Sequence, residues 1–404
     1  MELSGIRTLE QVDIDRRTVF VRVDFNVPMH DGKVGDDSRI QAALPTIEYL
    51  RERGARVILG SHLGRPRKGP DPALSLEPVA AHLANLLKGE VVMPDDCVGD
   101  GARRVVRELG EGGVCLLENL RFHEAEEKAD AVFASELAAL AEVYVNDAFG
   151  TAHRAHASTY TMVRHFPENR RAAGLLVARE LKFLGALLAD PAKPYVAVLG
   201  GAKVSDKIKV IENLIGRLDT LLIGGAMAYT FLAAQGVSVG RSLVEADKIG
   251  VAASLLALAE ARKTRLVLPV DHVIASGIDS TESTVTTSAS IPEGLAGFDI
   301  GPKTVELFGG HLAKARTIFW NGPLGVFEKP AFNKGTFSVA GFVADNPGMT
   351  VVGGGDSVAA LVESGRARHV SHVSTGGGAS LEFVEGRDLP GIAALRAGHR
   401  FEGT

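Results

Sequence analysis

Short apolar runs alternate with amphipathic segments along most of the 404-residue chain. Each run is rich in Val, Ile and Leu and does not alternate between apolar and polar residues. Such a pattern is typical of strands buried on both faces. Segments with apolar residues at helical spacing follow many of the runs. This alternation predicts an α/β protein with parallel sheets covered by helices. The predicted strands are 18–23, 56–59, 114–117, 142–145, 195–199, 220–223, 265–270, 317–320 and 350–352, and the predicted helices include 38–53, 77–87, 129–141, 203–216 and 246–262.

The segment 174–194 divides the chain into two halves. Val177, Leu181, Leu184 and Leu188 recur at helical spacing, and the prolines that follow end the helix. A chain of this length exceeds one ordinary core. We therefore predict two Rossmann-like three-layer domains with a cleft between them, joined by a connector helix that also serves as a hinge. The predicted boundaries are 1–173 and 195–385 for the domains, 174–194 for the connector and 386–404 for a separate C-terminal segment.

Composition excludes several classes of protein. Hydrophobic residues make up 46% and charged residues 23%, and the net charge of -5 argues against a general nucleic-acid binder. Cys97 and Cys115 lie neither in a CxxC motif nor near a His pair, so their spacing indicates no structural zinc site or disulfide framework. The N-terminus lacks an apolar signal core. We expect a cytoplasmic protein in a reducing compartment.

One uncharged run, 220–240, is long enough to span a bilayer. Gly224, Gly225, Gln235 and Gly236 interrupt it. A buried strand, a glycine turn and a packed helix explain this pattern better, so no membrane partner is expected. The Ser- and Thr-rich stretch 280–292 is interpreted as a surface loop or hairpin.

Basic side chains follow the predicted strands of the first half. Ligands bind beyond the carboxyl ends of parallel strands, so these loops meet at one sheet edge. A single Arg or His there is usually solvated or paired with an acid. Five from different loops could together hold a small polyanion, because the Arg guanidinium suits phosphate and carboxylate, with Asp24 and Asn26 orienting its hydroxyls. The five are Arg39, His62, Arg65, Arg121 and Arg154.

Glycine clusters follow the predicted strands of the second half. The first, at 200–201, precedes Lys203, which is expected to open a helix and share one face with Lys207. The others are 353–355, followed by Asp356 and Ser357, and 376–378. Amides at glycine-rich helix starts bind phosphate, and Asp356 could hold Mg²⁺. Tight turns and close packing also require glycine, so the clusters alone leave both interpretations open.

Several familiar motifs are absent. The sequence contains neither GxxxxGK[ST] nor GxGxxG, which excludes a P-loop and a standard dinucleotide fingerprint. It also lacks HExxH. Any nucleotide must therefore be bound by another arrangement.

Longer motifs identify a family. The chain resembles the bacterial type of phosphoglycerate kinase over nearly its whole length. The motifs that carry the resemblance are VDFNVP (23–28), DDSRI (36–40), SHLGRP (61–66), LLENLRF (116–122), NDAFGTAHRAHAST (146–159), LGGAKVSDKI (199–208), WNGPLGVFE (320–328), GGGDSVA (353–359) and STGGGASLEF (374–383).

The resemblance implies a reaction and a set of sites. The reaction is reversible, Mg²⁺-dependent transfer of a phosphoryl group between ATP and 3-phosphoglycerate, giving ADP and 1,3-bisphosphoglycerate, by direct in-line transfer after domain closure. The resemblance also implies a monomer whose last residues, 386–404, return to the first domain. The residues implied to bind 3-phosphoglycerate are Asp24, Phe25, Asn26, Arg39, His62, Leu63, Gly64, Arg65, Arg121 and Arg154. Those implied to bind the nucleotide are Lys203, Lys207, Gly297, Asn321, Glu328, Gly354, Gly355, Asp356 and Ser357, and Asp356 is also implied to hold Mg²⁺. Gly376, Gly377 and Gly378 are implied to contact the phosphate in the transition state, and Arg39, Lys203 and Lys207 are the implied catalytic residues.

The chain departs from the family pattern at a few places. Ala226 stands where a third glycine is common, and a proline often found at 123–126 is missing. Val177 and Ala178 replace a more usual Met-Glu pair. Three other interpretations stay open: a kinase for another small acid, a non-catalytic nucleotide- or phosphometabolite-binding protein and, more remotely, an NAD-dependent oxidoreductase.

Overall fold

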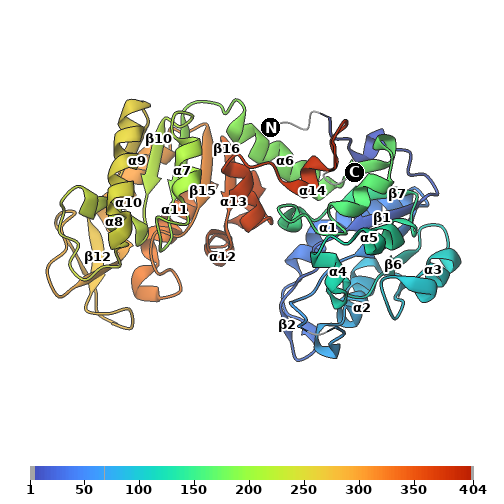
Figure 1. Cartoon of the computed structure of the whole chain (residues 1–404). Coiled ribbons are helices and arrows are strands. Elements are labelled where there is room, and N and C mark those ends of the chain that lie inside the picture. Colours follow the sequence, from blue (N-terminus) through green and yellow to red (C-terminus); the bar gives the residue numbers. More distant parts are fainter. Residues whose placement is uncertain (1–4, 68, 402–404) are drawn as a thin grey trace. The chain divides into compact units, whose positions relative to one another are not determined.

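The computed structural model describes residues 5–67 and 69–401 (Figure 1). They form two compact units: residues up to Lys182 together with those from Asp388 onward, and Phe183–Arg387. Each unit contains a sheet of six parallel strands, in the order β5-β6-β4-β1-β7-β8 and β11-β10-β9-β15-β16-β17. The predicted α/β class with two parallel sheets is confirmed.

The sheet of the first unit is apolar on both faces. Val19 and Val21 of β1 pack in one hydrophobic cluster with residues of α1 and α2. Phe20 projects to the opposite face and stacks with Tyr144 at a centroid distance of 6.1 Å. Successive side chains of the strand point to opposite faces of the sheet, and both faces are covered. Every residue of the strand is therefore buried, which explains the continuous apolar run. The bounds are β1 Thr18–Arg22, β4 Arg56–Gly60, β5 Val91–Val92, β6 Val114–Leu116, β7 Val143–Asn146, β8 Arg171–Ala173, α1 Ser38–Glu52 and α2 Glu77–Leu87.

Short elements complete the first unit. A two-stranded antiparallel hairpin joins β1 to α1, and 3-10 turns occupy several strand-to-helix loops. The remaining elements are β2 Met29–His30, β3 Lys33–Val34, α3 Gly99–Glu108, α4 Glu124–Glu127, α5 Ala131–Ala138, α14 Pro390–Ala393 and the 3-10 turns η1 Leu9–Gln11, η2 Pro72–Leu74, η3 Leu120–Phe122, η4 Phe149–Thr151, η5 Thr161–His165 and η6 Glu168–Arg170.

The C-terminal segment belongs to the first unit. The Nδ2 group of Asn146, at the end of β7, donates to the carbonyl of Gly391 at 3.2 Å. Arg171 of β8 donates to the carbonyl of Ala394 at 3.0 Å. Figure 1 shows this red segment next to green elements of the first unit. These bonds attach α14 to the edge of the sheet that β7 and β8 form.

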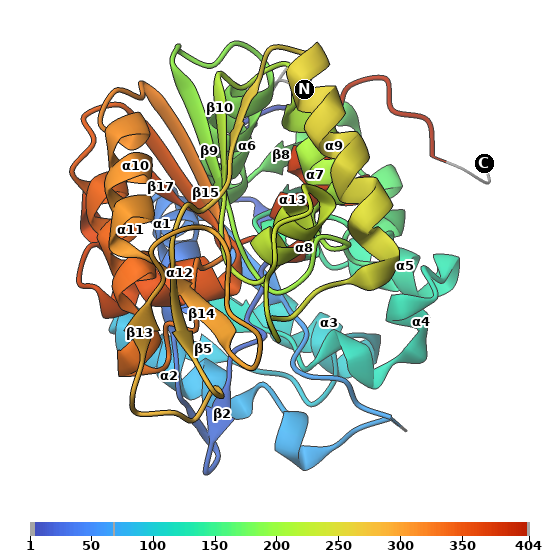
Figure 2. The same cartoon turned by 90° about the vertical axis from the view of Figure 1, so that its left-hand side faces the viewer.

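The sheet of the second unit is covered on both faces. Figure 2 shows α10 and α11 on one side and α7 and α9 on the other. Phe308 of α10 and Val339 of α11 share a hydrophobic cluster with the buried Trp320 of β15. The bounds are β9 Tyr195–Leu199, β10 Thr220–Ile223, β11 Arg265–Val267, β15 Thr317–Asn321, β16 Met349–Gly353, β17 His372–Val373, α7 Ile208–Leu214, α8 Met227–Ala234, α9 Ile249–Ala261, α10 Pro302–Leu312, α11 Lys334–Ala344, α12 Gly355–Glu363 and α13 Gly378–Val384.

A three-stranded antiparallel sheet, in the order β13-β12-β14, is the other part of the second unit. It contains the Ser- and Thr-rich stretch, in which β13 pairs with β12 as one arm of a hairpin. The bounds are β12 His272–Ala275, β13 Thr284–Val285, β14 Ala296–Ile300, with the 3-10 turns η7 Ala246–Lys248, η8 Pro330–Phe332 and η9 Ala367–His369.

Helix α6, Leu175–Leu188, contains the boundary between the units. Asp147 lies at its start in the first unit, where its Oδ1 accepts from the amides of Leu176 at 3.0 Å and Val177 at 3.3 Å. Burial raises the pKa of Asp147 to about 6. The predicted apolar positions of this helix are all buried. The helix thus begins on an internal carboxylate that satisfies its first amides.

Several predicted bounds were wrong. The helix predicted at 203–216 begins only at Ile208, because Glu245 binds the amide and hydroxyl of Ser205 at 3.1 and 2.6 Å and holds that residue in a loop. The helix predicted at 129–141 begins at Ala131, because Asp130 caps it. The strand predicted at 265–270 ends at Val267. The short edge strands β5, β8 and β17 were missed, since two or three residues carry too little pattern.

Residues 220–234 of the uncharged run 220–240 form β10, a turn at Gly224 and Gly225, and the eight-residue helix α8. The predicted strand, turn and helix are therefore confirmed. Within residues 5–67 and 69–401, no helix combines the length and apolar character needed to cross a bilayer.

Candidate active site

Loops after β1 and β4 meet at the carboxyl edge of the first sheet. Arg39, in the first turn of α1, donates through Nη1 to Asp24 Oδ2 at 3.2 Å and to the carbonyl of Asn26 at 2.9 Å. The Asn26 side chain in turn accepts from the amide of Gly64 at 2.8 Å. The structure thus brings together predicted ligand residues from three separate segments.

His62 lies at the centre of this group. It is buried, and its Nδ1 is 3.9 Å from Asp24 Oδ1. Burial lowers the pKa of His62 well below its usual value, and nearby guanidinium groups lower it further. The imidazole is therefore neutral within a strongly positive environment. The guanidinium groups that act on it are those of Arg22, Arg121, Arg154 and Arg39.

Arg121 joins the loops that follow β4 and β6. Its Nη1 donates to the carbonyl of Gly64 at 2.8 Å, and its Nε lies 3.1 Å from Glu127 Oε1. Asn119 bonds to both the amide and the carbonyl of Leu63, at 3.2 and 2.8 Å. These bonds position the loop backbone around His62.

Of three other residues predicted to bind 3-phosphoglycerate, two have buried apolar side chains and one is exposed. The side chains of Phe25 and Leu63 are buried in the core of the first unit, which leaves only their backbone to contact a ligand. Arg65 is exposed on the loop beyond Gly64. The cationic group therefore has a buried part and an exposed part.

Sequence reasoning missed a buried network behind these arginines. Arg22, the last residue of β1, is 1% exposed and donates through Nε to Ser158 Oγ at 2.8 Å. Ser158 donates to the fully buried Glu126 at 2.5 Å. The pKa of His156 falls to about 4, through burial and then the charges of Arg121, Arg22 and Arg154. A charged residue ending an apolar run was the available signal for Arg22.

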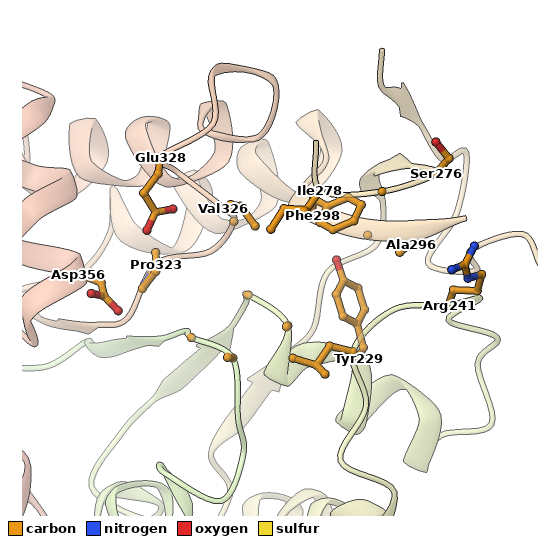
Figure 3. Close-up of a pocket in the computed structure, with 18 residues that line it drawn as sticks. Tyr229, Arg241, Ser276, Ile278, Ala296, Phe298, Pro323, Val326, Glu328 and Asp356 are labelled. Atoms are coloured by element: carbon orange, nitrogen blue, oxygen red, sulfur yellow. The ribbon is translucent and has the colours of Figure 1, made fainter. Parts of the chain in front are cut away.

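The second unit contains a cavity of about 660 Å³. Asp356 and Glu328 lie at one end, Arg241 and Ser276 at the other, and the Tyr229 ring between them (Figure 3). Predicted nucleotide residues that line it are Gly297, Glu328 and Asp356; residues that sequence reasoning missed include Tyr229, Arg241, Ser276, Ile278, Phe298 and Val326. Ile278, Phe298 and Val326 are apolar or aromatic side chains on an antiparallel strand or in loops, where a linear motif is weak, and Tyr229 lies on α8.

Lys207 is buried beside Asn321, to whose Oδ1 its Nζ donates. Burial lowers the pKa of Lys207, whereas the charges of Asp206, Asp356 and Glu385 oppose this shift. Asn321 Nδ2 is buried without a hydrogen-bond partner. Lys203, by contrast, is exposed in the loop before α7, so the predicted shared helix face of the two lysines was wrong.

The glycine clusters have different roles. The amides of Gly200 and Gly201 donate to the carbonyls of Asn321 and Pro323, both at 3.0 Å, so this cluster serves close backbone packing. Gly354 precedes α12 with φ +89°, a conformation that favours glycine. Gly377 precedes α13 with φ +53°. Ser357 Oγ accepts from the amide of Gly322 at 2.5 Å. Of the three clusters, only the second and third lead directly into the first turn of a helix at the carboxyl edge of the sheet.

These features define a class of protein. Each unit places polar side chains and helix starts beyond the carboxyl ends of parallel strands, where phosphate-bearing ligands bind in open α/β sheets. One unit gathers arginines, and the other combines a Lys and an Asp with a cavity large enough for a nucleotide. The arrangement is that of a small-molecule phosphotransferase.

Comparisons with known proteins identify the family. The family model described as phosphoglycerate kinase matches residues 9–387. A phosphoglycerate kinase of Anaeromyxobacter dehalogenans is 57% identical over 96% of this chain and 99% of its own, and one of Clostridium botulinum is 49% identical over 96% and 98%. The solved phosphoglycerate kinase of Coxiella burnetii has a TM-score of 0.89 at 39% identity, over 96% and 98% of the two chains.

The chain belongs to the phosphoglycerate kinase family. This family is the EC 2.7.2.3 kinase, which transfers a phosphoryl group between ATP and 3-phosphoglycerate. A crystal structure of phosphoglycerate kinase from Pyrococcus horikoshii, 36% identical with a TM-score of 0.80, covers 96% of this chain and 98% of its own.

Proposed function

We propose that this chain transfers the phosphoryl group directly and in line, in a Mg²⁺-dependent reaction, with 3-phosphoglycerate on the first unit and the nucleotide on the second. The observation that supports this most strongly is the convergence of Arg22, Arg39, Arg121 and Arg154 on the buried His62. Asp24 and Glu127 pair with Arg39 and Arg121 and neutralise part of this positive charge. A small polyanion that contacts the remaining guanidinium donors is therefore the expected occupant.

The arginines have the chemistry to bind both ends of 3-phosphoglycerate. Their planar forks suit a phosphate and a carboxylate equally. His62, neutral because of its lowered pKa, can donate or accept one hydrogen bond without adding charge. A general base is not needed, since the attacking carboxylate is ionised near neutral pH. We therefore assign His62 to substrate binding.

The cavity of the second unit suits a nucleoside triphosphate. The apolar and aromatic lining around Tyr229 and Phe298 would hold the base, and Glu328 would accept from the ribose hydroxyls. Asp356 fits Mg²⁺, because it is a carboxylate at the start of α12 and hard cations prefer oxygen ligands. When bound, Mg²⁺ would neutralise charge on the phosphate oxygens.

Positioning and charge account for the transfer itself. The positive charges of Arg39, Lys203 and Lys207 would stabilise the phosphoryl group during its transfer. The amides of 354–355 and 376–378 would donate hydrogen bonds to the leaving oxygens as negative charge develops on them. Lys207 is suited to this because its amine is fixed by Asn321, and the charges of Asp206, Asp356 and Glu385 oppose the lowering of its pKa by burial. No phosphoenzyme is required.

A coupled assay tests this proposal. ATP consumption should require 3-phosphoglycerate and Mg²⁺ together, and chelation of Mg²⁺ should abolish it. Activity on another carboxylic acid, with none on 3-phosphoglycerate, would instead identify a kinase of different specificity. Binding of both ligands without turnover would indicate a non-catalytic protein.

A further inference from the structure

Asp96, Cys97 and His123 come together in the first unit, although the spacing of the cysteines in the sequence gives no sign of it. Each residue offers one ligand atom, and these atoms all lie within 4.8 Å of one another. Cys97 precedes α3, and His123 separates η3 from α4. None of the three belongs to the residues that are assigned to 3-phosphoglycerate or nucleotide.

Protein contacts hold two of these groups in place. His123 Nε2 lies 2.7 Å from Asp96 Oδ1, which also accepts from the amide of Cys97 at 2.6 Å. The His123 ring stacks on Phe133 at a centroid distance of 5.1 Å and an interplanar angle of 28°. The carboxylate and the imidazole therefore have fixed orientations.

Burial differs across the cluster in a way that gives access to an ion. Cys97 is fully buried, His123 is partly buried, and Asp96 is exposed. The thiol thus forms the inner end of the cluster and the carboxylate its outer end. An ion could enter from the Asp96 side without passing through the core.

We propose that Asp96, Cys97 and His123 bind a transition-metal dication, with Zn²⁺ as the expected ion. Thiolate sulfur, imidazole nitrogen and carboxylate oxygen are the donors that Zn²⁺ accepts in proteins, and three protein ligands leave a fourth position for water. Sulfur and nitrogen donors disfavour Mg²⁺ and Ca²⁺. The site is therefore distinct in chemistry from the Mg²⁺ position at Asp356.

Metal binding requires the Cys97 thiolate. Burial and the neighbouring carboxylates of Asp96 and Glu126 hold the pKa of Cys97 well above its usual range, so the thiol is protonated without a metal. As the sulfur–zinc bond forms, the thiol proton leaves to solvent, and no oxidant or reductant is involved. The donor atoms must also rearrange, because two ligands of a tetrahedral zinc with bonds of about 2.0–2.3 Å lie more than about 3 Å apart. The contact between His123 Nε2 and Asp96 Oδ1 at 2.7 Å therefore opens to admit the ion, and the thiol sulfur approaches it.

A metal bound at this site would restrict the movement of the segment that contains Arg121. His123 directly follows η3, which contains Arg121, and Arg121 donates to the carbonyl of Gly64. A metal bound to His123 and Cys97 cross-links this segment to the start of α3. The cross-link stabilises the folded first unit, because an ion that binds only the folded state shifts the unfolding equilibrium.

Cobalt titration of the full-length protein tests the site. Co²⁺ replaces Zn²⁺ and gives an intense thiolate-to-cobalt charge-transfer absorption when sulfur is a ligand. The wild type should bind one equivalent with this absorption, and Cys97→Ala and His123→Gln should lose it. Cys115→Ala is the matched control, since Cys115 is the only other cysteine, is equally buried, and should leave the signal unchanged.

Thermal unfolding provides a second readout. Zn²⁺ should raise the Tm of the wild type and of Cys115→Ala, and leave that of His123→Gln unchanged. If Cys97→Ala does not fold, His123→Gln decides the result, because residue 123 is only partly buried. A wild type without the charge-transfer absorption, or an absorption that persists in His123→Gln, overturns the proposal.

Discussion

Arg39 connects the first turn of α1 with the loop after β1. It contacts Asp24 and Asn26, yet it is not fully buried, so its guanidinium also faces outward. The same group contributes positive charge at His62. We predict that Arg39 orders this loop and binds the substrate through its remaining donors.

We predict that Arg39→Ala lowers kcat by about 10²–10³-fold, the usual effect of removing one preorganised charge donor. Steady-state kinetics with 3-phosphoglycerate and ATP would measure it, with circular dichroism to verify folding. Arg104→Ala is the control, because Arg104 is exposed and pairs with Glu108 of the same helix. A near-normal kcat for Arg39→Ala would exclude this role.

His272 is a buried histidine outside the cavity lining. Its Nε2 lies 3.1 Å from the carbonyl of Ala289, its Nδ1 has no hydrogen-bond partner, and its ring is 5.3 Å from that of Tyr229. Burial lowers its pKa from 6.5 to about 4, although the Ala289 carbonyl and Asp271 act in the opposite direction. The folded state thus favours the neutral imidazole.

We predict that His272 contributes to acid unfolding. Between about pH 6.5 and 4 the unfolded chain binds a proton that the folded protein does not, so stability falls as the pH falls through this window. The loss would be at most about 3 kcal/mol, given 1.36 kcal/mol per pKa unit. Denaturant unfolding from pH 7.5 to 4 should show a shallower loss in His272→Gln, and parallel curves would contradict the prediction.

At the scale of elements, buried carboxylates set the ends and the packing of helices. Asp299 accepts from the amides of Gly335 at 2.7 Å and Ile300 at 2.9 Å, and burial raises its pKa to about 7. A Cβ atom added at Gly335 would lie 2.3 Å from Asp299 Oδ1. Helix α11 therefore depends on glycine at its second residue.

Two glycines of α11 make a matched test. Gly335→Ala should destabilise the second unit, because the new methyl group collides with the Asp299 carboxylate. Gly341→Ala should raise stability by up to about 1 kcal/mol, since an added Cβ would meet no atom within 4 Å beyond its chain neighbours and the backbone of its own helix, and alanine favours the helix. Thermal unfolding of both variants would measure the difference, and equal effects would show that Asp299 can move away.

The start of helix α7 could not be predicted from the pattern of apolar and polar residues. The predicted start at 203 came from a glycine-rich segment followed by lysines, whereas Glu245, remote in sequence, binds Ser205 and delays the helix to Ile208. A contact between distant segments cannot be recognised from periodicity. The same delay leaves Lys203 exposed and Lys207 buried.

At the scale of the whole molecule, the proposed substrate and nucleotide residues belong to different units. Direct in-line transfer requires the two ligands to touch, and a closed site also excludes water. We therefore predict that 3-phosphoglycerate with a non-hydrolysable ATP analogue and Mg²⁺ lowers the radius of gyration. Small-angle scattering would measure this, with each ligand alone as the control. An unchanged radius with both ligands bound would contradict closure.

The sequence by itself determined the α/β class and most of the sheet-edge residues. Strands buried on both faces must be apolar throughout, and the loops that follow them carry the polar side chains that remain. Asp24, Asn26, Arg39, His62, Arg121 and Arg154 were recognisable for this reason, before any contact was known.

Only the tertiary structure decided which distant residues meet. It buried Arg22 against Ser158, placed Tyr229 and Phe298 in one cavity, and brought Cys97 to His123. Each pair is separated by a long stretch of chain, and its approach depends on how helices pack on a sheet. Local patterns specify elements because they reflect burial within one segment, whereas contacts between segments depend on the packing of the whole unit.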